Sequence, residues 1–125
     1  MREKAVFYYK RGYGCSESIL LAAEEHYKID LPARLLDMCA GINTGFGVGA
    51  MCAVVIAAAL LFGLFFEETD VKRVRLRFIE EFNRRRGSLD CGKIIEGRSR
   101  FGACESVIAD AAEIASSLID ESFAS

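Results

Sequence analysis

The chain contains little proline and histidine and an odd number of cysteines, and each of these features excludes something. One proline in 125 residues favours helices over a loop-rich or all-β fold. His26 is the only histidine, which excludes histidine-rich metal centres and most His-dependent catalytic triads. Five cysteines cannot all pair in a closed disulfide framework. That count suits free thiols, a metal site with one cysteine to spare, or a catalytic pair.

We also expect no secretory signal. Residues 1–7 carry charges but contain neither an apolar stretch nor a small-residue cleavage site. We therefore expect a cytoplasmic protein in a reducing compartment, where structural disulfides are the less favoured use of cysteine. The net charge of −2 gives no reason to expect a polyanionic partner such as nucleic acid.

The uncharged stretch of residues 46–66 calls for a comparison with a membrane span. Its 21 residues are long enough to cross a bilayer. However, a Gly-x-Gly-x-Gly pattern over 45–49 marks a turn, so the helix should begin near residue 50 and end at Gly63. About 14 residues at ~1.5 Å each give roughly 21 Å, short of a ~30 Å hydrocarbon core. We predict a buried central helix and no membrane span.

Apolar periodicity near 3.6 residues recurs along the chain, and no convincing period-2 strand pattern appears. We expect Thr69-Asp70 to cap a long helix that ends before Gly87. The predicted fold is an all-α, single-domain bundle (residues 1–125) around the central helix of about residues 50–62. The predicted helices cover 2–11, 15–28, 33–40, 50–62, 70–86, 90–96 and 103–123.

Four cysteines share one position in this prediction. Each follows a glycine within four residues and lies at the cap or in the first turn of a predicted helix: Cys15, Cys52, Cys91 and Cys104. The positive end of a helix favours a thiolate, which lowers the thiol pKa and promotes metal ligation or redox chemistry. Four such helix ends that converge could hold a tetrahedral zinc ion or an iron–sulfur cluster.

Packing is the alternative role for these cysteines, because cysteine is a common small buried hydrophobe. The spacing contains no CxxC pair, so neither a zinc ribbon nor a thioredoxin-type site is indicated. Cys39 differs from the other four, because it lies late in a predicted helix beside Leu35 and Leu36. We interpret Cys39 as a packing residue.

The order of these motifs resembles the C-GCAxxG-C-C family of putative redox-active proteins. The resemblance extends from about residue 3 to 120 and is carried by Gly14-Cys15, the run 45–53, the segment 87–91 and Cys104. It implies a small helical electron-transfer module, similar to modules of larger redox proteins that hold an iron–sulfur centre. The redox or ligand set implied by the resemblance is Cys15, Cys52, Cys91 and Cys104.

The sequence departs from the family pattern at two positions. Met51 and Ile56 stand where the family has glycines, and bulky side chains there would restrict the size and access of a cofactor. Cys39 lies outside the family's cysteine set.

Other candidate sites receive simpler interpretations. His26 shares the apolar face of its helix, so we expect a hydrogen-bonded core histidine. The glycine run 45–49 lacks the Lys-Ser/Thr of a phosphate-binding loop. Arg73, Arg77 and Arg84 form an outward stripe, which is either a solvated face or a docking patch for an acidic redox partner.

Three hypotheses for function follow. The first is an electron-transfer protein with an iron–sulfur cluster on Cys15, Cys52, Cys91 and Cys104; zinc or no cofactor are the alternatives. The second is a metal-free thiol–disulfide protein that uses two of these cysteines. The third is a structural or interaction protein, either monomeric or homo-oligomeric, in which the cysteines only pack in the core. An electron-transfer or metal-binding role fits better than a stand-alone enzyme.

Overall fold

The computed structural model describes residues 1–94 and 100–123, with the side chains of residues 100–103 outside the description. Seven α-helices carry this part of the chain: α1 (Arg2–Lys10), α2 (Cys15–Tyr27), α3 (Ala33–Met38), α4 (Ala53–Phe65), α5 (Glu68–Arg86), α6 (Cys91–Ile94) and α7 (Arg100–Phe123). A 3₁₀ turn covers Cys39–Gly41, and a glycine turn covers Gly45–Gly49. In the described residues the sole β-type pairing is an isolated bridge between Met51 and Asp90, so the predicted all-α fold is confirmed.

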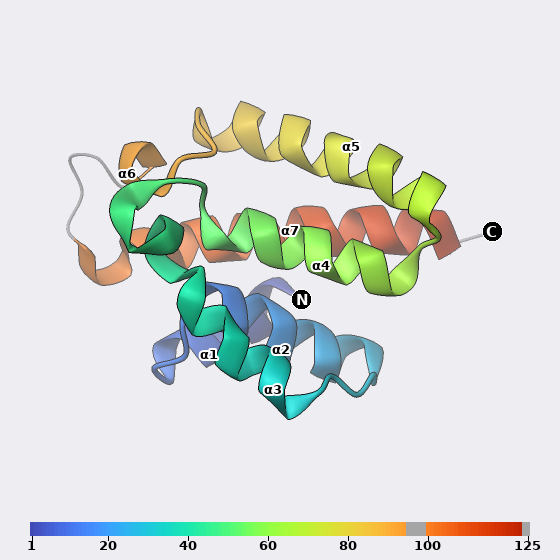
Figure 1. The fold of residues 1–125 in the computed structure, drawn as a ribbon, viewed down its shortest axis with the longest axis horizontal. Helices are drawn as coiled ribbons and strands as arrows, with labels where there is room; N and C mark the ends of the chain where they lie inside the picture. The colour runs from blue at the N-terminus through green and yellow to red at the C-terminus, as the bar shows by residue number, and fades with distance from the viewer. Residues whose placement is uncertain (95–99, 124–125) are drawn as a thin grey trace.

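Helix α4 is the centre of the bundle and contacts α2, α5 and α7 (Figure 1). It begins at Ala53 rather than at residue 50, because the preceding residues are extended and pair with the segment before α6. It also continues through Gly63 to Phe65. Gly63 is an exposed residue within α4, and the two residues before it, Leu61 and Phe62, are buried. No contact at Gly63 forces the helix to end there. In the described residues no helix combines the length and the apolar character needed to cross a membrane.

Helices α5 and α7 pack on α4 with the apolar stripes that their sequences predict. In α5 the buried side chains are Val74, Phe78 and Phe82. The apolar residues that recur at helical spacing in α7 are all buried: Val107, Ile108, Ala111, Ile114, Ala115, Leu118 and Ile119. The α5 start differs from the prediction, since Glu67 is the N-cap and Thr69-Asp70 lie in the first turn. Acidic residues in that turn complement the helix dipole, so no hydroxyl cap is required.

Helix α5 ends as predicted. Gly87 has φ of +77°, the left-handed conformation that glycine adopts without a steric penalty, and its N–H donates to the Asn83 carbonyl. The short helix predicted over 90–96 is present as α6, whereas residues 95–96 and Gly97 lie outside the described residues.

The prediction for His26 is wrong. Its side chain is exposed, although Ile19, Ala22 and Ala23 on the same predicted face are buried. His26 lies in the last turn of α2, where the ring makes an edge contact with Tyr27 at 4.7 Å between centroids. The apolar face of α2 therefore ends one turn before the helix does.

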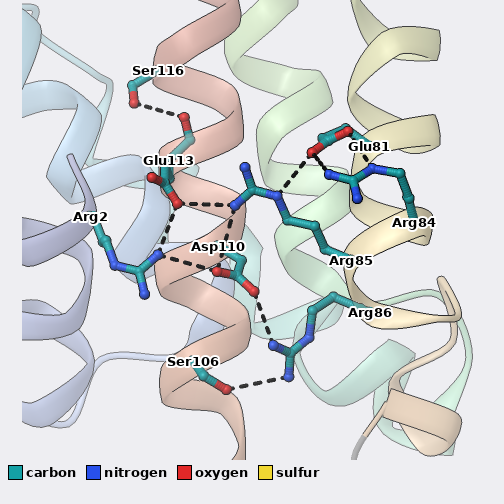
Figure 2. A network of polar contacts seen from close by, with 9 residues as sticks. All are labelled: Arg2, Glu81, Arg84, Arg85, Arg86, Ser106, Asp110, Glu113 and Ser116. Carbon is teal, nitrogen blue, oxygen red and sulfur yellow. Dashed lines mark hydrogen bonds and ion pairs between the residues drawn. The ribbon is translucent and has the colours of Figure 1, made fainter.

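An ionic network joins α1 and α5 to α7 (Figure 2). The Asp110 carboxylate lies 3.2 Å from the Arg2 guanidinium and 3.0 Å from that of Arg86. Glu113 accepts hydrogen bonds from Arg2 and Arg85, each at 3.0 Å. Arg86 and Asp110 are largely buried, so this pair is shielded from solvent screening more than an exposed pair would be.

One end of the bundle collects the helix beginnings. The first residues of α2, α4, α6 and α7 all lie at the same end of the molecule, together with the glycine turn and the C-terminal end of α1 (Figure 1). The four helix starts that carry the candidate cysteines are therefore neighbours in space.

Candidate functional site

Four cysteines line one pocket of about 190 Å³ at this end of the bundle. The lining residues are Tyr9, Cys15, Thr44, Cys52, Val54, Cys91, Cys104 and Ile108. Cys52 and Cys91 are each 6% exposed, whereas Cys15 and Cys104 are half-buried. The pocket therefore has two cysteines on its deep side and two toward its mouth.

A pair of backbone hydrogen bonds positions Cys52 and Cys91. The Cys52 N–H donates to the Leu89 carbonyl at 2.7 Å, and the Cys91 N–H donates to the Ala50 carbonyl at 2.6 Å. These two bonds flank the antiparallel bridge between Met51 and Asp90. The segments that introduce α4 and α6 are thereby joined, although the whole of α4 and α5 separates them in the sequence.

The glycine turn brings the chain into this bridge. Gly45 has φ of +58°, and a Cβ there would lie 2.5 Å from the Ala50 carbonyl oxygen. Its own carbonyl accepts a hydrogen bond of 3.0 Å from the Ala50 N–H, which closes the turn. Thr44 and Phe46 also have positive φ, of 60° and 63°, which is unfavourable for residues with a Cβ. Glycine at position 45 is thus required by the close approach as well as by the backbone conformation.

Cys15 is held by Asn43, a residue that sequence analysis did not identify. The Asn43 Oδ1 accepts hydrogen bonds from the Cys15 Sγ at 3.5 Å, from the Ser16 N–H at 3.2 Å and from the Ser16 hydroxyl. Its Nδ2 donates to the Glu17 carboxylate at 3.1 Å. Asn43 therefore caps the start of α2 from a distant part of the chain. Only the tertiary structure brings the two together, so the local sequence carries no signal for it.

Cys104 lies deeper in its helix than predicted. Because α7 begins at Arg100, Cys104 is its fifth residue rather than part of a first turn that starts at residue 103. Tyr9 from α1 lines the same pocket as Cys104. Tyr9 was also not identified from the sequence, since an aromatic residue in a short amphipathic helix is most simply read as packing.

Burial overrides the helix dipole in setting the thiol pKa values. Desolvation raises the pKa of Cys52 to about 12, although the Val54 N–H acts in the opposite direction. Desolvation and the neighbouring Cys15 also raise the pKa of Cys104, and Tyr9 has a smaller opposing effect. The expectation of lowered thiol pKa values is therefore wrong for these two cysteines. Transfer of the thiolate charge into an apolar pocket costs more free energy than its attraction to one helix N-terminus contributes.

The remaining cysteine and the two altered glycine positions do not line this pocket. Cys39 is buried in the hydrophobic core at 2% exposure, as the packing interpretation predicts. Met51 and Ile56 line a different, apolar pocket of about 250 Å³ between α4 and α5, together with Phe78. Their bulk therefore does not fill the space enclosed by the four cysteines.

The arginine stripe on α5 is exposed, as predicted, and each member has a carboxylate partner. Arg73 lies 3.8 Å from Asp70, and Arg84 lies 2.6 Å from Glu81. Arg77 binds both carboxylate oxygens of Glu121 at 3.3 Å. These pairs reduce the positive potential that the sequence suggests for this face.

The donor set that lines the pocket consists of four thiols, the ligand type that a zinc ion or an iron–sulfur cluster takes. Within residues 1–94 and 104–123, no three His, Cys, Asp or Glu side chains are grouped so that they could hold a metal ion.

The protein is therefore a small all-α bundle in which four cysteines line one pocket. A family model described as "Putative redox-active protein (C_GCAxxG_C_C)" matches residues 13–118, and the chain belongs to this family. Helix α1, which contributes Tyr9 to the pocket, lies outside the matched residues. No curated protein and no solved structure matches the chain.

Proposed function

We propose that this protein transfers single electrons through an iron–sulfur cluster bound by Cys15, Cys52, Cys91 and Cys104. The observation that supports the proposal is their arrangement. Four cysteines from four separate helix regions, spread over most of the chain, line one pocket. Membership of a redox-active family supports the same general role.

The high pKa of the Cys52 thiol favours metal ligation over thiol–disulfide exchange. Exchange requires attack by a thiolate, and the pKa of Cys52 near 12 leaves almost none at neutral pH. A bound metal centre supplies the positive charge that removes this obstacle, because a coordinating thiol is deprotonated outright. Buried thiols of high pKa thus fit a site that is completed by metal.

The protein's own residues would define the environment of the bound sulfurs. Val54 and Ile108 line the pocket with apolar surface and restrict water. The backbone bridge holds the Cys52 and Cys91 segments in a fixed relation. A bound cluster would supply one-electron chemistry, with a potential set by burial and by hydrogen bonds to the cysteine sulfurs.

A redox partner would dock through complementary charge. We keep Arg73, Arg77 and Arg84 as the proposed contact surface for an acidic partner protein in a reducing cytoplasm. Docking there requires the partner's carboxylates to compete with Asp70, Glu81 and Glu121, which already pair with these arginines. Such exchange predicts an association rate that falls with salt and falls further in an R73Q/R77Q/R84Q variant.

Anaerobic purification tests the proposed cofactor. We expect a brown protein, with iron and acid-labile sulfide in matched amounts, either as isolated or after reconstitution with iron and sulfide. Cys52→Ser should lose most of the colour without loss of fold, because Cys52 is the N-cap of α4 and serine is a favoured N-cap residue. Cys39→Ser is the matched control and should retain the colour. A colourless, sulfide-free protein after reconstitution would exclude the proposal.

The two outer cysteines favour a second candidate function. Cys15 and Cys104 are half-buried at the pocket mouth and interact electrostatically. In a metal-free thiol–disulfide protein they would form one disulfide and pass two electrons and two protons to a partner disulfide, which becomes two thiols. Peptide mass spectrometry of oxidised protein would then find a Cys15–Cys104 cross-link in place of bound iron.

A further inference from the structure

An apolar pocket of about 250 Å³ lies between α4 and α5, and no described residue lines both this pocket and the cysteine pocket. The two helices are consecutive in the chain and pack against each other (Figure 1). The rings of Phe62 and Phe78 are fully buried and form its inner end, where they meet edge to face with 5.7 Å between their centroids. Met51 and Arg75 also line the pocket but are exposed, so they mark its opening. The pocket is therefore apolar inside and carries a cation at its mouth.

Two side chains of this pocket depart from the family pattern. The motif GCAxxG has glycines at the positions that Met51 and Ile56 occupy in this chain. Both side chains line the pocket, and glycines in their place would leave that side of it without a wall. The enclosed apolar space is thus a feature of this chain, and the family's cysteine pattern does not imply it.

Arg75 differs from the other arginines of α5. Within the described part of the chain, every other arginine of this helix forms an ion pair with a carboxylate, whereas Arg75 forms none. The paired residues are Arg73, Arg77, Arg84, Arg85 and Arg86. Of the described residues that line the pocket, Arg75 alone carries a charge. A guanidinium at the mouth of an apolar pocket is suited to a ligand that has an acidic group next to hydrocarbon.

We propose that this pocket binds a small amphipathic carboxylate, whose hydrocarbon part lies against Phe62 and Phe78 and whose acid group pairs with Arg75. The planar guanidinium presents a fork of N–H donors that matches the two oxygens of a carboxylate. The volume of about 250 Å³ is below the ~300–1,000 Å³ of drug-sized sites but exceeds the ~150 Å³ of an apolar cavity that holds benzene. The ligand is therefore limited to one ring or a short alkyl chain.

Binding of octanoate to the full chain tests the proposal. The chain has three methionines, so labelling with methyl-¹³C methionine gives a simple NMR spectrum. Met51 lines the pocket, whereas Met38 is exposed on α3 and serves as an internal reference. We expect a saturable shift of the Met51 methyl signal, below the concentration at which octanoate forms micelles, and an unchanged Met38 signal. The absence of a saturable Met51 shift would overturn the proposal, whether or not the cysteines hold a cluster.

Two comparisons test the role of the acid group. Octanamide keeps the chain length and the headgroup shape but has no charge, so we expect it to bind about tenfold more weakly than octanoate. Arg75→Gln should weaken octanoate binding about tenfold and leave octanamide binding unchanged. Arg73→Gln is the matched control, because Arg73 lies in the same helix and pairs with Asp70, and it should bind octanoate as the unmodified protein does. Equal affinities for the two ligands, or for octanoate in the two variants, would overturn the proposal.

A second copy of the chain is the other occupant that an exposed apolar surface could take. In that case the Met51 signal would shift with protein concentration in the absence of octanoate, and sedimentation would show a dimer. This outcome would overturn the small-ligand proposal.

Discussion

Cys52 and Cys91 are held in register by two reciprocal backbone hydrogen bonds between the segments that precede α4 and α6. The Cys52 N–H reaches the Leu89 carbonyl, and the Cys91 N–H reaches the Ala50 carbonyl. The bridge satisfies backbone N–H groups at the starts of two helices, where an N–H group has no acceptor within its own helix. It also fixes the positions of the two most buried cysteines of the pocket without any side-chain contribution.

The glycine turn that leads into this bridge should be sensitive at Gly45. Gly45→Ala and Gly47→Ala both place a Cβ at positive φ, which costs about 1–2 kcal/mol. At Gly45 the new Cβ also collides with the Ala50 backbone, whereas at Gly47 it meets no described atom within 4 Å. We expect Gly45→Ala to lower the free energy of unfolding by a further 1–3 kcal/mol or so, as overpacking does, measured by urea denaturation. Equal losses in the two variants would contradict the close approach at Gly45.

Asn43 should be important for stability as well as for the position of Cys15. Asn43→Ala removes the cap of α2 and leaves the fully buried Ser16 without its acceptor. We expect a loss of about 2 kcal/mol in the free energy of unfolding, together with faster alkylation of Cys15 as the pocket mouth loosens. Asn83→Ala, at an exposed position of α5, is the matched control and should change neither measurement. A neutral Asn43→Ala variant would rule out its capping role.

The buried thiol of Cys52 predicts a loss of stability at high pH. Its pKa is about 12 in the folded protein, against an ordinary value of 9.0. Between these values the unfolded chain releases the proton and the folded chain retains it, so the free energy of unfolding falls as pH rises. The contribution is complete below pH 9 and is lost as pH approaches about 12.

Metal-free Cys52→Ser protein provides the comparison for this pH effect. Other groups with raised pKa values, such as Tyr27, are present in both proteins and cancel in the difference. The stability gap between the two proteins should be constant up to pH 8 and should shift in favour of Cys52→Ser above pH 9. Parallel stability curves from pH 8 to 11 would show that the Cys52 thiol ionises as easily in the folded state as in the unfolded one.

The ionic network on α7 predicts different costs for buried and exposed carboxylates. Asp110 is mostly shielded from solvent and faces the guanidinium groups of Arg2, Arg85 and Arg86 (Figure 2). Asp110→Asn should lower the free energy of unfolding by about 2 kcal/mol, because it removes charge-assisted hydrogen bonds and leaves Arg86 poorly paired. Glu68→Gln breaks a highly exposed pair with Lys72 and should have no measurable effect in the same denaturation experiment. Similar losses for both would contradict the special position of Asp110.

Local sequence patterns predicted most of the helices but not all of their ends. The inward face of α7 and the Gly87 cap follow from periodicity and from the glycine preference for positive φ, and both are confirmed. The start of α4 was placed three residues too early because residues 50–52 are held extended by a distant segment. His26 was misplaced because periodicity does not indicate where the neighbouring helices stop covering α2.

The sequence by itself determined the helical class, the order of the cysteines and the glycine that the turn before Cys52 requires, because these depend on interactions between residues close along the chain. Only the tertiary structure decided that Cys15, Cys52, Cys91 and Cys104 share a pocket, that Asn43 reaches the Cys15 sulfur and that Tyr9 lines the same pocket. It also decided that burial outweighs the helix ends in setting the pKa of Cys52. Desolvation and long-range hydrogen bonds depend on which helices pack together, and that information is spread over the whole chain rather than present in any one motif.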